Sequence, residues 1–197
     1  MKFENKIERG LLHNHTQNSL FDSAMSVKEL FDKAYEYGAP AVMLSDHGTG
    51  MGFQEAKKLI GRYDGMKVIY AVEFYVNYEP LGKRAHLIVA AKDITGYNGI
   101  IKLLTKSNHQ IDSQGMPIVN FSDLKEFFGR GGKYENSVVV TSACMGGVIA
   151  TPLLFNFYLE KEIEKMQMLA VLGQTNRYNG HSHNAGMQCV QILKGLS

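Results

Sequence analysis

The chain has 197 residues, of which 45% are hydrophobic and 20% charged, and its formal net charge is +2. This length and composition are typical of one globular domain with a core of its own, and they exclude the small scaffolds that need a covalent staple. The net charge is too small to indicate nucleic-acid binding by itself, although local basic patches remain compatible with it.

Cysteine usage and the N-terminus predict a cytoplasmic location. Cys144 and Cys189 are the only cysteines and lie far apart, which argues against a disulfide framework and for a reducing compartment. Residues 1–6 lack the apolar core of a signal peptide, and no apolar run is long enough to span a bilayer. We therefore expect no membrane contact.

Strand-like and helix-like stretches alternate along the chain. Ser26 and Glu29 form a capping box ahead of an amphipathic helix that Gly38 ends, and Ser122 is the expected cap of a later helix. The expected strands are 41–45, 68–76, 85–91 and 138–141, and the other expected helices are 53–60, 97–106, 122–128 and 152–172. This alternation predicts an α/β fold built from parallel β/α units, either an open doubly wound sheet or a barrel.

Two histidines near the N-terminus are separated by a single residue. In an extended backbone, His13 and His15 would point to the same side, so both imidazoles could reach one metal ion. Asp22 would add an oxygen ligand from the loop that follows. A structural or surface role for the pair is the alternative, because two histidines at this spacing are a weak signal alone.

Further polar residues fall at the predicted strands. Asp46 and His47 follow the strand at 41–45, and Glu73 lies inside the apolar run 68–76. His86 is near the start of the next strand, and Cys144 follows the last one. Burying a carboxylate costs several kcal/mol unless it is paired or metal-bound, so Glu73 needs a partner.

Each of these residues also has a simpler interpretation. Asp46 and His47 could cap a helix, Glu73 could pair with Lys67, His86 could be a satisfied core histidine, and Cys144 could be a small buried apolar residue. These residues lie on successive β/α units, however, and one metal centre would account for all of them.

The ordered motifs resemble those of a known family. They are L-x-H-x-H-x-x-x-S-L-x-D, S-D-H-G, V-E-F-Y-V, H-L-I-V-A-A-K-D-x-x-G-Y and S-A-C-M-G-G, within residues 11–149. The series is similar to the PHP (polymerase and histidinol phosphatase) domain, above all to its form at the N-terminus of bacterial DNA polymerase III alpha subunits. The resemblance implies a distorted, TIM-like (β/α)7 barrel with up to three divalent metals, zinc, manganese or iron, at the strand C-termini.

The resemblance also implies a set of site residues. The metal ligands carried over by match are His13, His15, Asp22, His47, Glu73, His86 and Cys144. Asp46 is expected to orient its neighbours or to act as an occasional ligand, and Asp46, His47 and Glu73 are the expected catalytic residues. The family's late D-x-H motif is absent after Ile149; His181 and His183 have the spacing to replace it, or else belong to a polar loop.

These observations predict a metal-binding barrel core at residues 1–150, complete or cut short at its C-terminus, with a helix and tail at 151–197. The implied function is metal-dependent phosphoesterase activity: 3′–5′ exonuclease, pyrophosphatase or small-phosphomonoester hydrolysis, with a phosphate ester or nucleic-acid 3′ end as substrate. The length leaves no room for polymerase domains. One alternative is a non-catalytic PHP remnant or fragment that stabilises or docks DNA polymerase subunits, and another is a metal-free β/α binding protein.

Overall fold

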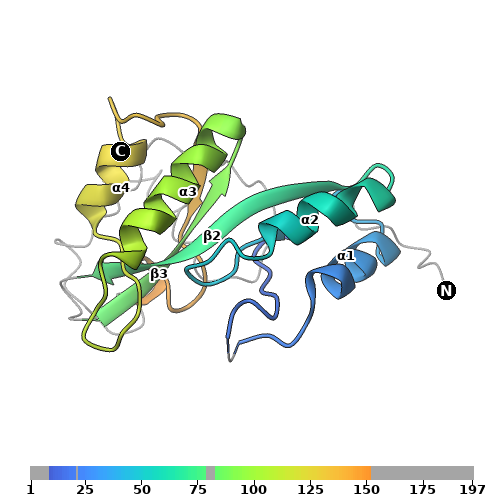
Figure 1. Cartoon of the computed structure of the whole chain (residues 1–197), viewed down its shortest axis with the longest axis horizontal. Helices are drawn as coiled ribbons and strands as arrows, with labels where there is room; N and C mark the ends of the chain where they lie inside the picture. The colour runs from blue at the N-terminus through green and yellow to red at the C-terminus, as the bar shows by residue number, and fades with distance from the viewer. Residues whose placement is uncertain (1–8, 21, 79–82, 152–197) are drawn as a thin grey trace. The chain divides into compact units, whose positions relative to one another are not determined.

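The computed structural model describes residues 9–20, 22–78 and 83–151 (Figure 1). These residues fall into two compact units, one that ends at Glu73 and one that begins at Phe74. The helix predicted at 152–172, the histidine pair His181 and His183, and Cys189 lie outside the described residues.

The first unit contains the earliest helices and a pair of parallel strands. Its elements are α1 (Val27–Glu36), β1 (Ala41–Leu44), α2 (Phe53–Leu59), the 3-10 helix η1 (Ile60–Arg62) and the first part of β2 (Lys67–Tyr78). The strands β1 and β2 are parallel, with Cα partners running from Ala41 and Lys67 to Leu44 and Tyr70. The parallel arrangement predicted for these strands is therefore confirmed.

Helix α1 begins and ends where the sequence predicts. The Ser26 side chain accepts a hydrogen bond from the Glu29 backbone N–H, and the Glu29 carboxylate accepts one from the Ser26 N–H, which is a capping box. Gly38 follows the helix with a φ of 71°, a conformation that glycine adopts without steric cost. The apolar face of the helix is buried, and Phe31 packs edge-on against the Tyr63 ring.

The second unit contains the end of β2, β3 (Lys83–Ala91), α3 (Ile94–Asn108), α4 (Phe121–Phe128) and β4 (Val138–Thr141). Two glycines let α3 approach its neighbours closely. A Cβ at Gly96 would overlap the Ser137 carbonyl oxygen, and one at Gly99 would lie 2.8 Å from the Phe128 ring. Any larger residue at either position would push the helix away from this core.

The four described strands pair in the order β1-β2-β3-β4 and form an open sheet in a mixed α/β fold. The expectation of parallel strands throughout is wrong for β3 and β4, which pair antiparallel from Ile88 and Thr141 to Ala91 and Val138. Strand direction depends on the end of β3 to which the chain returns, and the long connection through α3 and α4 permits either direction. The seven-stranded barrel remains a prediction.

Two helix starts also differ from the expected ones. Helix α3 begins at Ile94 because the Asp93 side chain accepts a hydrogen bond from the Gly96 N–H. Helix α4 begins at Phe121 rather than after Ser122, since Asn120 is its N-cap and donates its backbone N–H to the Asp123 carboxylate. A cap residue is recognised only when its side-chain or backbone bond is made, and several polar residues compete for that role.

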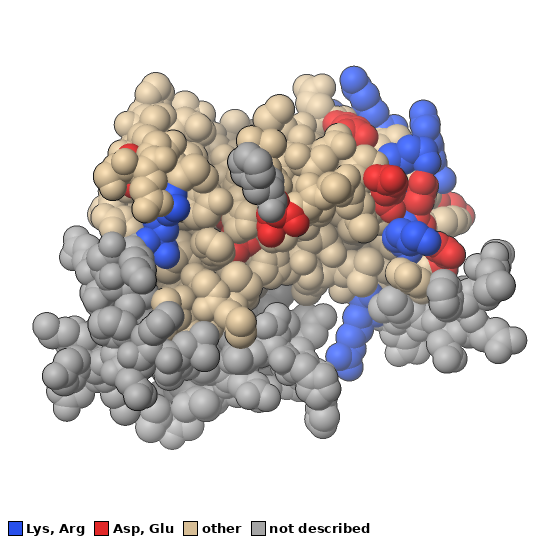
Figure 2. All heavy atoms as spheres, turned by 90° about the horizontal axis from the view of Figure 1, so that it is seen from below, with Lys and Arg blue, Asp and Glu red and all other residues tan. Residues whose placement is uncertain are grey.

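Charged side chains on α1 are paired rather than grouped by sign. The Lys28 and Lys33 ammonium groups lie 2.6 and 2.8 Å from the carboxylates of Asp32 and Glu36. Figure 2 shows Lys and Arg next to Asp and Glu on that face, not one continuous basic area. Within the described part of the chain, no helix is both long and apolar enough to cross a membrane.

Candidate metal centre

The loop that carries His13 and His15 leaves the sheet through a bend. Leu11 pairs with β1, donating to the Ala41 carbonyl and accepting from Met43, both at 2.8 Å. His13 then has a φ of 65°, so the backbone is not extended there as the sequence analysis assumed. The Asn14 amide holds the bend by donating to the carbonyls of Leu11 and Met43 at 2.8 and 3.1 Å.

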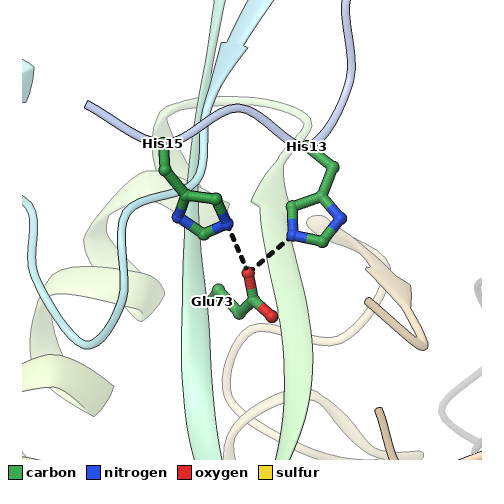
Figure 3. A group of neighbouring side chains, drawn as sticks. All are labelled: His13, His15 and Glu73. Carbon is green, nitrogen blue, oxygen red and sulfur yellow. Dashed lines mark hydrogen bonds and ion pairs between the residues drawn. The ribbon is translucent and has the colours of Figure 1, made fainter. Parts of the chain in front are cut away.

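Despite the bend, the two imidazoles converge on one buried carboxylate. The Nε2 atoms of His13 and His15 lie 2.7 and 3.0 Å from the same oxygen, Oε2 of Glu73 (Figure 3). The Glu73 side chain is 0% exposed. A buried carboxylate needs a partner that offsets the cost of its burial, and the two histidines provide it. Lys67 is the partner in the simpler interpretation of the sequence.

The sheet register places His47 next to Glu73. Beyond the end of β1, Asp46 accepts a backbone hydrogen bond from Glu73, and Gly48 donates one to the Glu73 carbonyl. His47 and Glu73 therefore form a parallel bridge that continues the β1–β2 pairing. The sequence Ser45-Asp46-His47-Gly48 thus brings the second histidine motif to the same edge as the buried acid.

A second group of donor atoms forms around Asp22. Its Oδ2 atom lies 3.5 Å from Nδ1 of His15 and 3.4 Å from Nε2 of His47. The rings of His15 and His47 are stacked, with centroids 4.5 Å apart. Two sets of three donors in the first unit are thus close enough to hold a metal ion: His13, His15 and Glu73, and His15, Asp22 and His47.

Asp46 supports the loop. It is 3% exposed and accepts hydrogen bonds from the Thr16 N–H at 2.6 Å, the Thr16 hydroxyl at 2.8 Å and the Ser19 hydroxyl at 2.9 Å. Both carboxylate oxygens are therefore engaged in holding residues 16–19 against the end of β1. The sequence predicts no role for Thr16 or Ser19, although Ser19 belongs to the S-L-x-D part of the first motif.

The electrostatic environment of His15 favours positive charge. Burial is the largest single influence and lowers its pKa, but the hydrogen bond to Glu73 and the charges of Glu73, Asp22 and Asp46 together raise the pKa above its ordinary value. The negative charges that stabilise an imidazolium would also stabilise a bound metal ion. The surroundings of His15 therefore favour a positive charge at this position.

The donor set fits a divalent transition metal. Imidazole nitrogens and carboxylate oxygens suit zinc, manganese and iron. Metal bonds of about 2.0–2.1 Å in a tetrahedral shell place neighbouring ligand atoms about 3.3 Å apart. The separations of 2.7 and 3.0 Å at Glu73 need to open by only a few tenths of an ångström to reach that geometry.

Two further predicted ligands lie together in the second unit. The Cys144 sulfur is 3.6 Å from Nδ1 of His86 in β3 and accepts a hydrogen bond from the Gly146 N–H at 3.3 Å. The backbone fixes this pair, since His86 donates to the Gly146 carbonyl at 2.9 Å. Ala143 has a φ of 58°, and Cys144 is only partly buried, unlike a purely apolar cysteine.

Comparison with known proteins identifies the class. Residues 12–178 match the family model of the PHP domain, and the chain belongs to that family. DNA polymerase III subunit alpha of Borreliella burgdorferi is 30% identical over 175 residues, covering 82% of this chain and 14% of that protein. The corresponding subunit of Aquifex aeolicus is 32% identical over 151 residues, covering 70% of this chain and 12% of that protein.

The subunit from Treponema pallidum is 30% identical over 179 residues, covering 85% of this chain and 14% of that protein. The family resemblance expected from the sequence motifs is therefore confirmed. The chain spans 12–14% of the length of these curated relatives.

Proposed function

We propose that this chain is a metal-dependent phosphoesterase of the PHP type. The observation that carries the proposal is the convergence of His13 and His15 on one oxygen of the fully buried Glu73. A buried carboxylate faced by two imidazole nitrogens can bind a positive ion. Membership of the PHP family supports phosphoester hydrolysis as the reaction at this site.

Each residue of the first unit has a defined task. His13, His15 and Glu73 would hold one ion, while Asp22 and His47 supply donors for another. Asp46, expected from the sequence to be catalytic or to orient its neighbours, would position the loop through Thr16 and Ser19. A divalent ion held here would neutralise phosphoryl oxygens and lower the pKa of a bound water, which is the chemistry that phosphoester hydrolysis needs.

The proposed substrates are phosphate esters, including the 3′ end of a nucleic acid, and pyrophosphate. The alpha subunits among the relatives support the nucleic-acid substrate and DNA polymerase subunits as partners. His86, Cys144, His181 and His183 remain predicted ligands, with zinc, manganese or iron as the metal and up to three ions bound. The distorted (β/α)7 barrel remains the expected family fold, and the parallel pairing of β1 and β2 supports it.

Metal analysis of protein purified without chelator tests the proposal. We expect at least one transition metal per chain, and the double variant His13→Ala/His15→Ala should lose most of it. The exposed His109, the C-cap residue of α3, provides the matched control His109→Ala, which should keep its metal. Full metal content in the double variant would refute the assignment.

Activity is the second part of the test. We expect weak manganese-stimulated hydrolysis of p-nitrophenyl phosphate or none at all, because the family's late D-x-H motif is absent after Ile149. If His181 and His183 replace that pair, His183→Ala should lose activity and stay folded. Strong turnover that is unaffected by His183→Ala would show that the earlier ligands suffice.

A non-catalytic role is the second candidate. It is favoured by one observation: the relatives are alpha subunits of DNA polymerase III. A domain of this kind would stabilise or dock polymerase subunits. Two results together would favour this role over hydrolysis. The folded, metal-loaded protein would show no turnover with any metal, and it would co-purify with polymerase subunits.

A further inference from the structure

We infer that Ser19 is a positioning residue that selects which nitrogen of His15 binds the metal. In this assignment Ser19, backed by Asp46, holds the proton on Nδ1 of His15 and leaves Nε2 as the ligand atom. The inference rests on the proposed metal site and adds to it a residue that touches no metal. Its basis is the hydrogen-bond count at a single hydroxyl group.

The Ser19 hydroxyl is 1% exposed and has one proton and two lone pairs to place. An ionised carboxylate only accepts hydrogen bonds, so the Ser19 proton points to Oδ1 of Asp46 at 2.9 Å. The backbone N–H of His47 donates to the Ser19 oxygen at 3.0 Å and occupies one lone pair. The remaining lone pair faces Nδ1 of His15 at 3.1 Å.

This arrangement requires a proton on Nδ1 of His15. A bare Nδ1 would place two acceptors against each other at hydrogen-bond distance. The neighbouring Asp22 carboxylate oxygen, 3.5 Å from the same nitrogen, is also an acceptor and favours the same proton position. An imidazole that keeps its proton on Nδ1 offers its lone pair at Nε2, the nitrogen that faces Glu73.

The consequence is a choice between the two donor groups of the first unit. His15 belongs to both groups, but with Nδ1 protonated it can give only Nε2 to a metal. Ser19 therefore directs His15 to the ion held with His13 and Glu73. The Asp22 carboxylate would then face the Nδ1–H of His15, and Asp22 and His47 would bind an ion without that nitrogen.

The test uses zinc, which is diamagnetic, and the protein labelled with ¹⁵N at histidine. In the zinc-loaded wild type, we expect NMR to show a metal-bound Nε2 and a protonated Nδ1 at His15, with the Nδ1 proton close to the Ser19 methylene protons. This measurement needs no variant. It therefore remains decisive even where a substitution at the buried Ser19 prevents folding.

Ser19→Ala supplies the second measurement, with Thr16→Val as its control. Both remove a hydroxyl that donates to Asp46, and of the two hydroxyls it is that of Ser19 that lies at hydrogen-bond distance from the His15 ring. Loss of an outer hydrogen-bond partner of a metal-binding histidine typically weakens metal affinity about 10–100-fold. We expect that loss in Ser19→Ala, together with faster solvent exchange of the Nδ1 proton. Thr16→Val also loosens the loop, so it should lose less affinity than Ser19→Ala and keep the slow exchange of the Nδ1 proton.

Several outcomes would overturn the inference. Zinc bound through Nδ1 in the wild type would do so, as would wild-type zinc affinity in folded Ser19→Ala. Equal losses in Ser19→Ala and Thr16→Val would show that both hydroxyls merely dock the loop. A wild type that binds no zinc at all would refute the proposed function itself, and the two failures are therefore distinguishable.

Discussion

The two units of the chain present candidate metal ligands in different ways. In the first unit, His13 and His15 face a fully buried carboxylate, and the loop that carries them is tied to Asp46 by hydrogen bonds from Thr16 and Ser19. In the second unit, His86 and Cys144 face each other at 3.6 Å, and the bonds that fix them run through the backbone of Gly146.

The two groups differ in donor chemistry: the first unit sets carboxylates beside its histidines, whereas the pair in the second unit is a thiol and an imidazole. The buried carboxylates of Glu73 and Asp46 would favour a cation in the first unit, whatever its identity. A cysteine becomes a strong metal ligand only when its thiol loses its proton, whereas a neutral imidazole already offers a lone pair. We therefore expect metal affinity to depend mainly on the first unit and metal preference to depend more on the second.

The largest effect is expected for Glu73→Gln, which keeps the shape of the side chain but removes its charge. Loss of an outer partner costs about 10–100-fold in metal affinity, and loss of a ligand's charge should reach at least the upper end of that range. The metal-loaded variant should also melt below the metal-loaded wild type. Normal metal binding with a higher melting temperature would show that Glu73 destabilises the fold and does not bind metal. The two units would then not differ in metal affinity on account of Glu73.

A smaller effect is expected for Asp46→Asn, which acts on the support of the loop. The amide nitrogen would meet one of the donors that Thr16 and Ser19 direct at Asp46, and leaving a buried donor unsatisfied costs about 1–3 kcal/mol. Urea denaturation should show this loss in the free energy of unfolding. The exposed Asp64 provides the control Asp64→Asn, and equal stability of the two variants would contradict a supporting role for Asp46.

The fold could be predicted from sequence wherever local signals decide it. The capping box at Ser26 and Glu29 and the apolar strand of residues 138–141 lie where the sequence places them. The direction of β4 could not be predicted, because it depends on how α3 and α4 return the chain to the sheet. Periodicity reports which residues are buried, and it carries no information on strand direction.

The site could be predicted in its residue types and not in its geometry. Glu73 is identified by one fact, a carboxylate in an apolar strand, and the structure gives it His13 and His15 as partners. The bend at His13 has no sequence signal, since a histidine with positive φ depends on the bonds that Asn14 makes. Ser19 was overlooked for a similar reason: a serine shows its importance only through its neighbours.

A selective effect is expected for Cys144→Ser when cobalt(II) is the probe. A thiolate bound to cobalt gives a charge-transfer absorption, which reports that Cys144 is a ligand. Soft thiolate ligands also select among metals. The wild type should show this absorption and Cys144→Ser should lose it while keeping most of its bound metal. The variant His13→Ala/His15→Ala should show the reverse pattern, and loss of all metal in Cys144→Ser would contradict an affinity that depends mainly on the first unit.

The smallest effect is expected for Gly146→Ala, which disturbs the second pair without removing either donor. The new methyl carbon would lie 3.3 Å from Nδ1 of His86 and 3.6 Å from the Cys144 sulfur, so the ring has to shift by a few tenths of an ångström. The free energy of unfolding should change by less than about 1 kcal/mol, because the added methyl group also restricts the unfolded chain. The cobalt absorption should change while zinc affinity stays at the wild-type value.

Gly61→Ala is the matched control, since a methyl group there meets nothing within 4 Å. An unchanged cobalt spectrum in Gly146→Ala would mean that His86 and Cys144 adjust freely, and that the turn at Gly146 does not set their geometry.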